Sequence, residues 1–175
     1  MAVLLRNRRI VSDGWQSLEP RRWLQVGEDG LVPDFPAAAD LIITPRLWAL
    51  RREDLLERSG RLGLRLEPED DPGAFAAELG HFALLAVNFP KFGDGRGFSI
   101  ARLLRERYGY QGELRALGQV TRDHLFFMDS CGFDSFALRE CEDPEEALSG
   151  FGDFSEAYQA CVARPQPLFR RRLRA

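Results

Sequence analysis

Short apolar runs alternate with helical patterns along the chain from about residue 40 onward. The run Phe82–Phe89 is apolar on both faces, which is typical of a central strand in a parallel sheet. Strands are expected at 41–43, 62–66, 82–89, 114–117 and 133–138. This alternation predicts an α/β fold, a mostly parallel sheet of about five strands with covering helices. The pattern leaves open whether the sheet is an open sheet or a partial barrel.

Helix starts are marked by a polar capping residue before the first helical turn. A proline in that turn strengthens the prediction at Thr44–Pro45, Asp71–Pro72 and Asp143–Pro144. Ser99 is expected to cap a further helix, which ends at Gly109. Another helix is expected over residues 121–130.

The two ends of the chain have different patterns from the middle. Residues 1–40 are expected to form an antiparallel β-hairpin appendage, with short strands at Val3–Leu5, Ile10–Val11 and Trp23–Val26. Residues 165–175 lack periodicity and are rich in arginine, which predicts an extended or disordered tail. We therefore interpret 1–175 as a single domain with its α/β core at 41–164.

The composition of the 175 residues is that of an ordinary globular protein, with 45% apolar and 29% charged residues. The formal net charge of −3 argues against a nucleic-acid partner, since such proteins carry a basic excess. No apolar run is long enough to span a membrane, and the N-terminus lacks a signal-peptide pattern. We expect a cytoplasmic protein that binds neither nucleic acid nor membrane.

The cysteines and histidines are too dispersed along the sequence for a metal or redox centre. Cys131, Cys141 and Cys161 form no CxxC pair, and an iron–sulfur cluster takes four thiolates. The two histidines, His81 and His124, lie far apart without carboxylates at ligand spacing. We expect reduced thiols, no metal and no cofactor.

A glycine-rich loop, Pro90–Phe98, follows the expected central strand. Ligands of parallel α/β proteins bind at the carboxyl ends of the strands, so this loop is the first candidate site. Its glycines let backbone amides converge at a helix N-terminus, and Lys91 (the single lysine) and Arg96 add positive charge. Such a loop fits phosphate, sulfate or a substrate carboxylate. The predicted anion-binding residues are Asn88, Lys91, Gly93, Asp94, Gly95, Arg96, Gly97, Ser99 and Arg122, with Gln119 and Arg139 expected on the same rim.

The loop matches no complete nucleotide-binding motif. It is not the P-loop pattern GxxxxGK[ST], and Phe98 stands where the GxGxxG fingerprint has its third glycine. Two alternatives to anion binding stay open. One is a structural turn in which Asp94 and Arg96 pair with the scaffold, and the other is a loop that docks a protein.

The remaining reactive side chains assign no catalyst. His124, in the first turn of a helix near the rim, is an acid–base candidate or a helix-surface histidine. His81 is expected at the amino end of the central strand, the wrong edge for a ligand site. Ser99 lacks the GxSxG context of a nucleophile, and Cys131 at a helix C-terminus is expected to have a raised thiol pKa.

Several stretches share one longer pattern, beginning with FPKFGDGRGFS at residues 89–99 and IARLLR at 100–105. GELRA at 112–116, CGFDSF at 131–136 and FSEAYQ at 154–159 continue it. Together they resemble the bacterial family catalogued as domain of unknown function 934, over most of residues 40–172. The family tends to have an acidic residue where this chain has Gln119, so Gln119 is not nominated as a catalyst.

The resemblance implies a link to sulfur metabolism. Genes of this family commonly lie beside those for assimilatory sulfite reductase and adenylyl-sulfate reductases. We therefore expect an accessory protein of assimilatory sulfate and sulfite reduction, which binds one of these reductases or a small anion such as sulfate or phosphate and catalyses no reaction alone. Two alternatives stay open, an oxidoreductase acting on a sulfur metabolite with electrons from a partner, and a ligand-sensing regulatory module.

Overall fold

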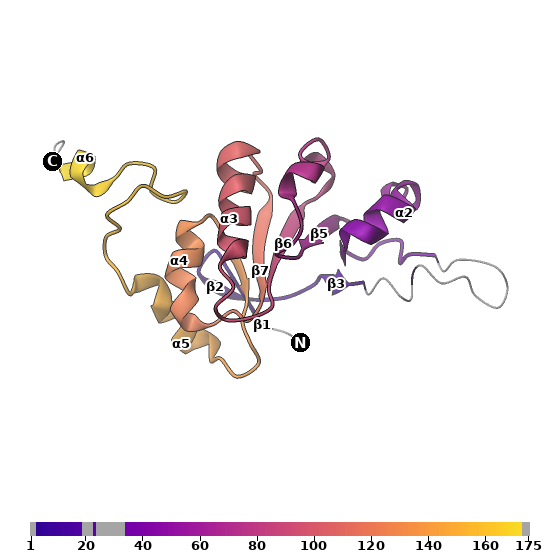
Figure 1. The fold of residues 1–175 in the computed structure, drawn as a ribbon. Coiled ribbons are helices and arrows are strands. Elements are labelled where there is room, and N and C mark those ends of the chain that lie inside the picture. The colour runs from indigo at the N-terminus through magenta and orange to yellow at the C-terminus, as the bar shows by residue number, and fades with distance from the viewer. Residues whose placement is uncertain (1–2, 19–22, 24–33, 173–175) are drawn as a thin grey trace.

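A computed structural model describes residues 3–18, 23 and 34–172, which form one mixed sheet and several helices (Figure 1). The sheet has eight strands in the order β2-β1-β8-β7-β6-β5-β4-β3, and the prediction of about five was too low. Its strands are β1 Val3–Arg6, β2 Arg9–Ser12, β3 Gln16–Ser17, β4 Leu41–Ile43, β5 Leu62–Leu66, β6 Leu84–Phe89, β7 Glu113–Gly118 and β8 Ser135–Ala137.

The parallel part of the sheet agrees with the sequence prediction. Strands β3 to β8 pair in parallel in sequential order, and β6 lies inside the sheet between β5 and β7. Each of the five predicted runs overlaps one of the strands β4 to β8, and β7 extends one residue beyond its predicted run at each end. They are recognisable because every residue of β4 is buried, as are all residues of β6 except Asn88.

The additional strands come from the N-terminal region. The predicted hairpin of β1 and β2 is confirmed, but it is joined to the main sheet, because β1 pairs antiparallel with β8. The two-residue strand β3 was not predicted and pairs in parallel with β4. Most of the strand predicted at Trp23–Val26 lies outside the described residues.

The sheet is curled into a half-barrel. Strands β2 and β3 lie at its opposite edges, yet only residues 13–15 separate them in the chain. Four Cα–Cα steps span at most about 15 Å, whereas eight flat strands at about 4.8 Å spacing would be roughly 34 Å wide. The edges therefore approach each other. Of the two alternatives left by the sequence, the sheet is the partial barrel and not the open sheet.

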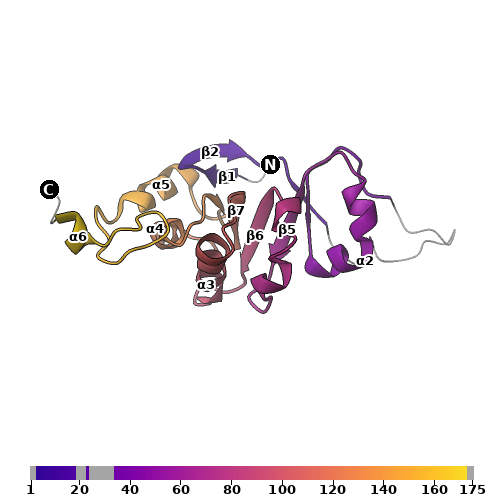
Figure 2. The ribbon, with the colours of Figure 1, turned by 90° about the horizontal axis from the view of Figure 1, so that it is seen from above.

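The helices from α2 to α5 follow the convex, outer side of the curved sheet (Figure 2). Sequential parallel strands with crossovers of one hand place all their helices on the same side. On this side, strand side chains such as Phe89 of β6, Ala116 of β7 and Phe136 of β8 form the main hydrophobic core. The α-helices whose bounds the structure describes are α2 Pro45–Leu56, α3 Arg96–Arg102, α4 Leu125–Ser130, α5 Pro144–Leu148 and α6 Leu168–Arg172. The π-helix η3 Leu103–Arg107 continues α3, and short 3-10 helices are η1 Pro72–Phe75, η2 Leu79–His81, η4 Arg122–His124 and η5 Ser149–Gly152.

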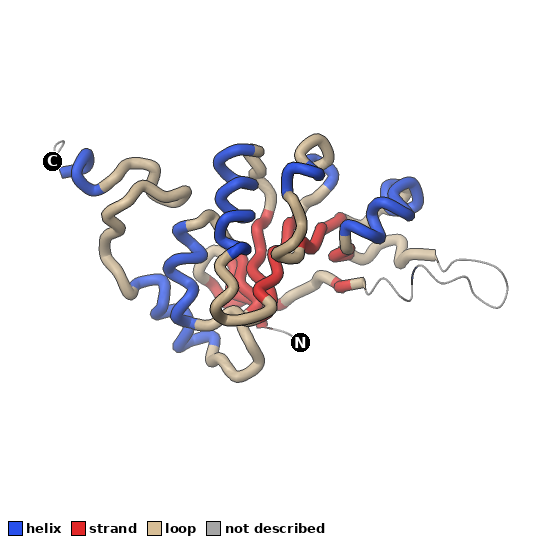
Figure 3. The backbone as a smooth tube through the Cα atoms, viewed as in Figure 1, coloured by secondary structure: helices blue, strands red, loops and turns tan. Residues whose placement is uncertain are grey.

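Two helix predictions at residue level are wrong. Ser99 lies inside α3, which begins at Arg96 with Gly95 at the cap position, so Ser99 does not cap it. The tail, predicted to be extended or disordered, contains α6 at 168–172. A long stretch between α5 and α6 is mostly loop (Figure 3) and leads α6 away from the sheet.

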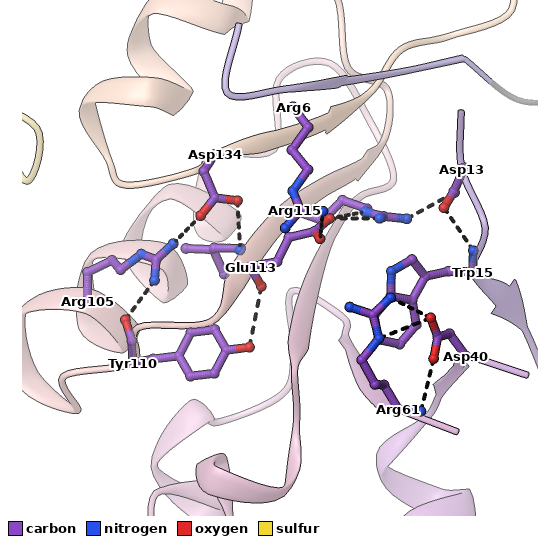
Figure 4. A network of polar contacts seen from close by, with 11 residues as sticks. Arg6, Asp13, Trp15, Asp40, Arg61, Arg105, Tyr110, Glu113, Arg115 and Asp134 are labelled. Atoms are coloured by element: carbon purple, nitrogen blue, oxygen red, sulfur yellow. Dashed lines mark hydrogen bonds and ion pairs between the residues drawn. The ribbon is translucent and has the colours of Figure 1, made fainter. Parts of the chain in front are cut away.

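The concave side of the sheet is covered by the N-terminal chain. Trp15, in the link between β2 and β3, packs with Ile42 and Leu84 in a second, smaller core. Beside it, the buried Arg115 donates to Glu113 at 3.0 and 2.7 Å and to Asp13 at 2.9 Å (Figure 4). We call residues 13–15 the strap, because they cross the concave face and connect β2 and β3, the strands at its two edges.

Candidate functional site

The loops that follow the parallel strands meet at one edge of the half-barrel, which we call the carboxyl rim. Strands β5, β6 and β7 end at Leu66, Phe89 and Gly118. The parallel register that pairs Phe89 with Gly118 places the glycine-rich loop directly beside the loop after β7. The predicted position of the loop is confirmed.

Asn88 at the rim has a partner within the scaffold. Its side-chain amide donates to Glu67 at 2.6 Å, and the other carboxylate oxygen of Glu67 pairs with Arg65 at 2.8 Å. Gly118, with φ of +90°, lies against this pair, because a Cβ there would be 2.4 Å from the Phe89 carbonyl oxygen and 2.7 Å from Asn88 Oδ1. The side chain of Asn88 and the missing side chain of Gly118 therefore allow the ends of β6 and β7 to pack closely against each other.

The charges of the glycine-rich loop are paired with one another. Asp94 accepts from the backbone amide of Arg96 at 3.2 Å and from its guanidinium at 3.0 and 2.7 Å. A second carboxylate, Glu69, lies 2.9 Å from Arg96. Hydrogen bonding to Arg96 lowers the pKa of Asp94 to about 2, and the pairing raises the pKa of Arg96. An anion at this loop would have to displace Asp94, so anion binding stays a prediction.

Only one of the three loop glycines is required by packing. A Cβ at Gly97 would lie 2.6 Å from the ring of the buried Phe89. At Gly93 nothing lies within 4 Å, and at Gly95 the nearest atom is 3.9 Å away on Phe98. Neither has a positive φ. The loop surface is therefore bare backbone at Gly93 and Gly95, accessible to a close-fitting partner.

The other predicted residues lie apart from the Asp94–Arg96 pair. Lys91 is exposed, and its backbone carbonyl accepts from the Asp94 amide at 3.1 Å. Its ammonium group makes no hydrogen bond or ion pair with the residues that the structure describes. Ser99 is exposed on α3. Arg122 donates to both oxygens of Asp153 at 3.1 and 2.6 Å and to Ser149 at 3.1 Å, on the side of η5. These contacts hold Arg122 with the C-terminal part of the chain and not with the loop.

A row of rings lies next to the loop. The centroids of Phe92 and His124 are 4.4 Å apart, those of Phe98 and His124 6.3 Å, and those of Phe98 and Phe127 4.8 Å. Phe92 and Phe127 are 58% and 55% exposed. We call these four residues the ring surface. Sequence reasoning identified His124 but missed the three phenylalanines; the aromatic residues of KFGDGRGF and HLFF were the available signal.

The pKa of His124 lies below its ordinary value, which favours the neutral imidazole. Its partial burial lowers the pKa, and a hydrogen bond with the Gln119 backbone opposes this effect. Thr121 Oγ1 lies 3.4 Å from Nδ1. A neutral imidazole is suited to stacking under Phe92, because no charge has to be desolvated between the two rings.

The described residues contain no group of three or more His, Cys, Asp or Glu side chains that could hold a metal ion. Among the same residues, no helix is both long and apolar enough to cross a membrane. The ring surface, the paired loop and the bare glycines are the distinctive features of the rim.

Fold and site together define an α/β half-barrel protein with an aromatic surface at its carboxyl rim. Residues 63–169, more than half of the chain, match a family described as bacterial protein of unknown function (DUF934). The chain belongs to this family, which confirms the resemblance found in the sequence. A search of curated proteins gave no match.

Proposed function

We propose that this protein is an accessory protein of assimilatory sulfite reduction and docks onto a reductase through the ring surface and the adjacent loop. The proposed class of partner rests on the resemblance to a family whose genes commonly lie beside those for assimilatory sulfite reductase. The mode of binding follows from the rim. No reaction is assigned to the chain alone.

The exposed rings are the observation that carries the docking proposal. Phe92 and Phe127 each have more than half of their surface in solvent, and Phe98 and His124 join them into one patch. Contiguous apolar surface of this kind marks interaction sites, and buried aromatic side chains supply much of the affinity of protein interfaces. Covering the patch would remove both rings from water.

The loop supports docking better than it supports capture of a free anion. Arg96 is held by two carboxylates, Asp94 and Glu69, so its charge is already compensated. Gly93 and Gly95, in contrast, present backbone without side chains beside Phe92. A partner surface can approach this backbone closely and reach the unpaired ammonium of Lys91.

Binding to purified assimilatory sulfite reductase from the same organism tests the proposal. Phe92→Ala and Phe127→Ala each remove one exposed ring, and each is expected to weaken binding at least about thirtyfold, as for an interface hot spot of about 2 kcal/mol. Tyr158→Ala is the matched control, because Tyr158 is 71% exposed but outside the ring surface. Unchanged affinity of both phenylalanine variants, or no binding by the wild type to any assimilatory reductase, would reject the proposal.

A further inference from the structure

Two of the three cysteines, 30 positions apart in the sequence, are brought together by the fold. Cys131 follows α4 and is buried, whereas Cys161 is partly exposed in the long segment after η5. The backbone amide of Val162, the residue after Cys161, donates to the carbonyl of Ser130, the residue before Cys131, at 3.1 Å. This bond places the two cysteines opposite each other.

The segment around Cys161 is held in one conformation. Cys161 and Arg164 exchange two backbone hydrogen bonds of 2.9 and 3.1 Å, which close a tight turn. Val162 of this turn packs over Gly132, where a Cβ would lie 3.0 Å from Val162 Cγ1. Contacts with Ser130 and Gly132, on both sides of Cys131, therefore fix the turn against the end of α4.

We propose that Cys131 and Cys161 form a thiol pair that is oxidised to an intrachain disulfide by a small disulfide such as oxidised glutathione. A disulfide needs two α-carbons within about 7 Å. The hydrogen bond from Val162 to Ser130 joins the peptide group after Cys161 to the one before Cys131, which brings the two cysteine backbones close together. Cys141 is exposed and lies outside these contacts, so it is not a member of the pair.

The exposures of the two thiols define the order of events. Burial raises the pKa of Cys131 to about 11, with a smaller contribution from the nearby Cys161, so Cys131 is protonated at neutral pH and shielded from solvent. Cys161 reacts first. Its thiolate attacks one sulfur of oxidised glutathione, whose S–S bond breaks, and one glutathione leaves as a thiolate that takes up a proton.

Closure of the pair completes the exchange. The sulfur of Cys131 attacks Sγ of Cys161 and breaks the mixed disulfide, while the proton of the Cys131 thiol passes to the departing glutathione sulfur. The second glutathione thus leaves as a thiol. Two protein thiols are oxidised to one disulfide and one oxidised glutathione is reduced to two thiols. The product links the turn at 161–164 covalently to the end of α4.

Disulfide mapping on the full chain tests the pair. The protein is incubated with excess oxidised glutathione, free thiols are alkylated under denaturing conditions, and the chain is digested with trypsin and a glutamyl endopeptidase. Cleavage after Arg139, Glu142 and Glu156 separates the three cysteines into different peptides. The expected product is a Cys131–Cys161 peptide pair with Cys141 alkylated.

Single variants identify each step. Cys161→Ser is expected to lose the cross-link completely, whereas Cys131→Ala should retain glutathione on Cys161. Cys141→Ser is the matched control and should form the cross-link as the wild type does. Three results in the wild type would each overturn the proposal: stable glutathione on Cys161 with Cys131 alkylated, a cross-link through Cys141, or no reaction at Cys161.

Discussion

The guanidinium of Arg115 donates to the carboxylate of Asp13 at 2.9 Å, across 102 positions of sequence. Arg115 stands on β7 inside the sheet, and Asp13 belongs to the strap that joins the two outermost strands. Glu113 accepts from the same guanidinium and pairs with Arg6 on β1 at 3.4 Å. The cluster balances two cations with two anions, and it ties the strap to the interior of the half-barrel.

The strap cluster predicts a loss of stability on removal of one charge. Arg115 is 1% exposed, and removing one partner of a buried pair typically costs about 3–5 kcal/mol because the other charge stays buried. Arg115→Met should therefore lower the free energy of unfolding by about this amount in urea titrations. Arg102→Met is the control, because Arg102 pairs with Glu106 on an exposed helix face and contributes about 0.5 kcal/mol or less. Equal effects of the two substitutions would contradict the role of the cluster.

The strap cluster belongs to the part of the structure that could not be predicted from the sequence. The strands from β4 to β8 could be predicted because each is a local apolar run, and the loop at the rim followed from the end of β6. The curl could not, since it depends on strap residues contacting strands that are distant in the chain. The ring surface was missed for the same reason: Phe92 lies in the loop after β6 and Phe127 lies on α4, and they are connected through His124 and Phe98.

The three loop glycines are expected to respond differently to alanine. Gly97→Ala inserts a methyl group 2.6 Å from the Phe89 ring, and such overpacking costs about 1–3 kcal/mol, partly offset by about 1 kcal/mol of helix propensity. Gly93→Ala and Gly95→Ala meet open space and should change the free energy of unfolding by less than about 0.5 kcal/mol. Under the docking proposal, the last two variants nevertheless weaken reductase binding. Thermal unfolding and binding measured on the same three proteins separate the two effects.

Removal of the Asp94 carboxylate is expected to expose an anion site. The Asp94 carboxylate accepts hydrogen bonds from the backbone amide and the guanidinium of Arg96. With a pKa of about 2, this carboxylate stays ionised throughout the neutral range. Asp94→Asn should therefore raise sulfate affinity about tenfold over the wild type, since it frees a charged hydrogen-bond donor. The double variant with Arg96→Ala should lose the gain. Calorimetric titration with sulfate checks both; tight binding by the wild type would mean that Asp94 does not block the loop.

The stability of the protein is expected to fall in mild acid through His124. Its folded-state pKa lies below the ordinary value, so the unfolded chain binds the proton more readily. This contribution to stability is present above about pH 6.5 and is lost as the pH falls below it. His124→Asn should flatten the dependence of the melting temperature between pH 7.5 and 5.5. His81→Asn, which alters the exposed histidine at the other edge, should leave it as in the wild type.

The proposed role in the cell predicts a defect limited to inorganic sulfur. A strain lacking the gene should grow poorly on sulfate or sulfite and normally on cysteine, because cysteine bypasses the reduction. The wild-type gene and Tyr158→Ala should restore growth, whereas a Phe92→Ala and Phe127→Ala double variant should not, since it retains the fold but lacks both exposed rings of the docking surface. Sulfite reductase activity in extracts should follow the same order. Normal growth of the deletion strain on all three sources, with unchanged extract activity, would contradict a role in sulfite reduction. Full rescue by the double variant would instead place the contact with the reductase elsewhere on the half-barrel.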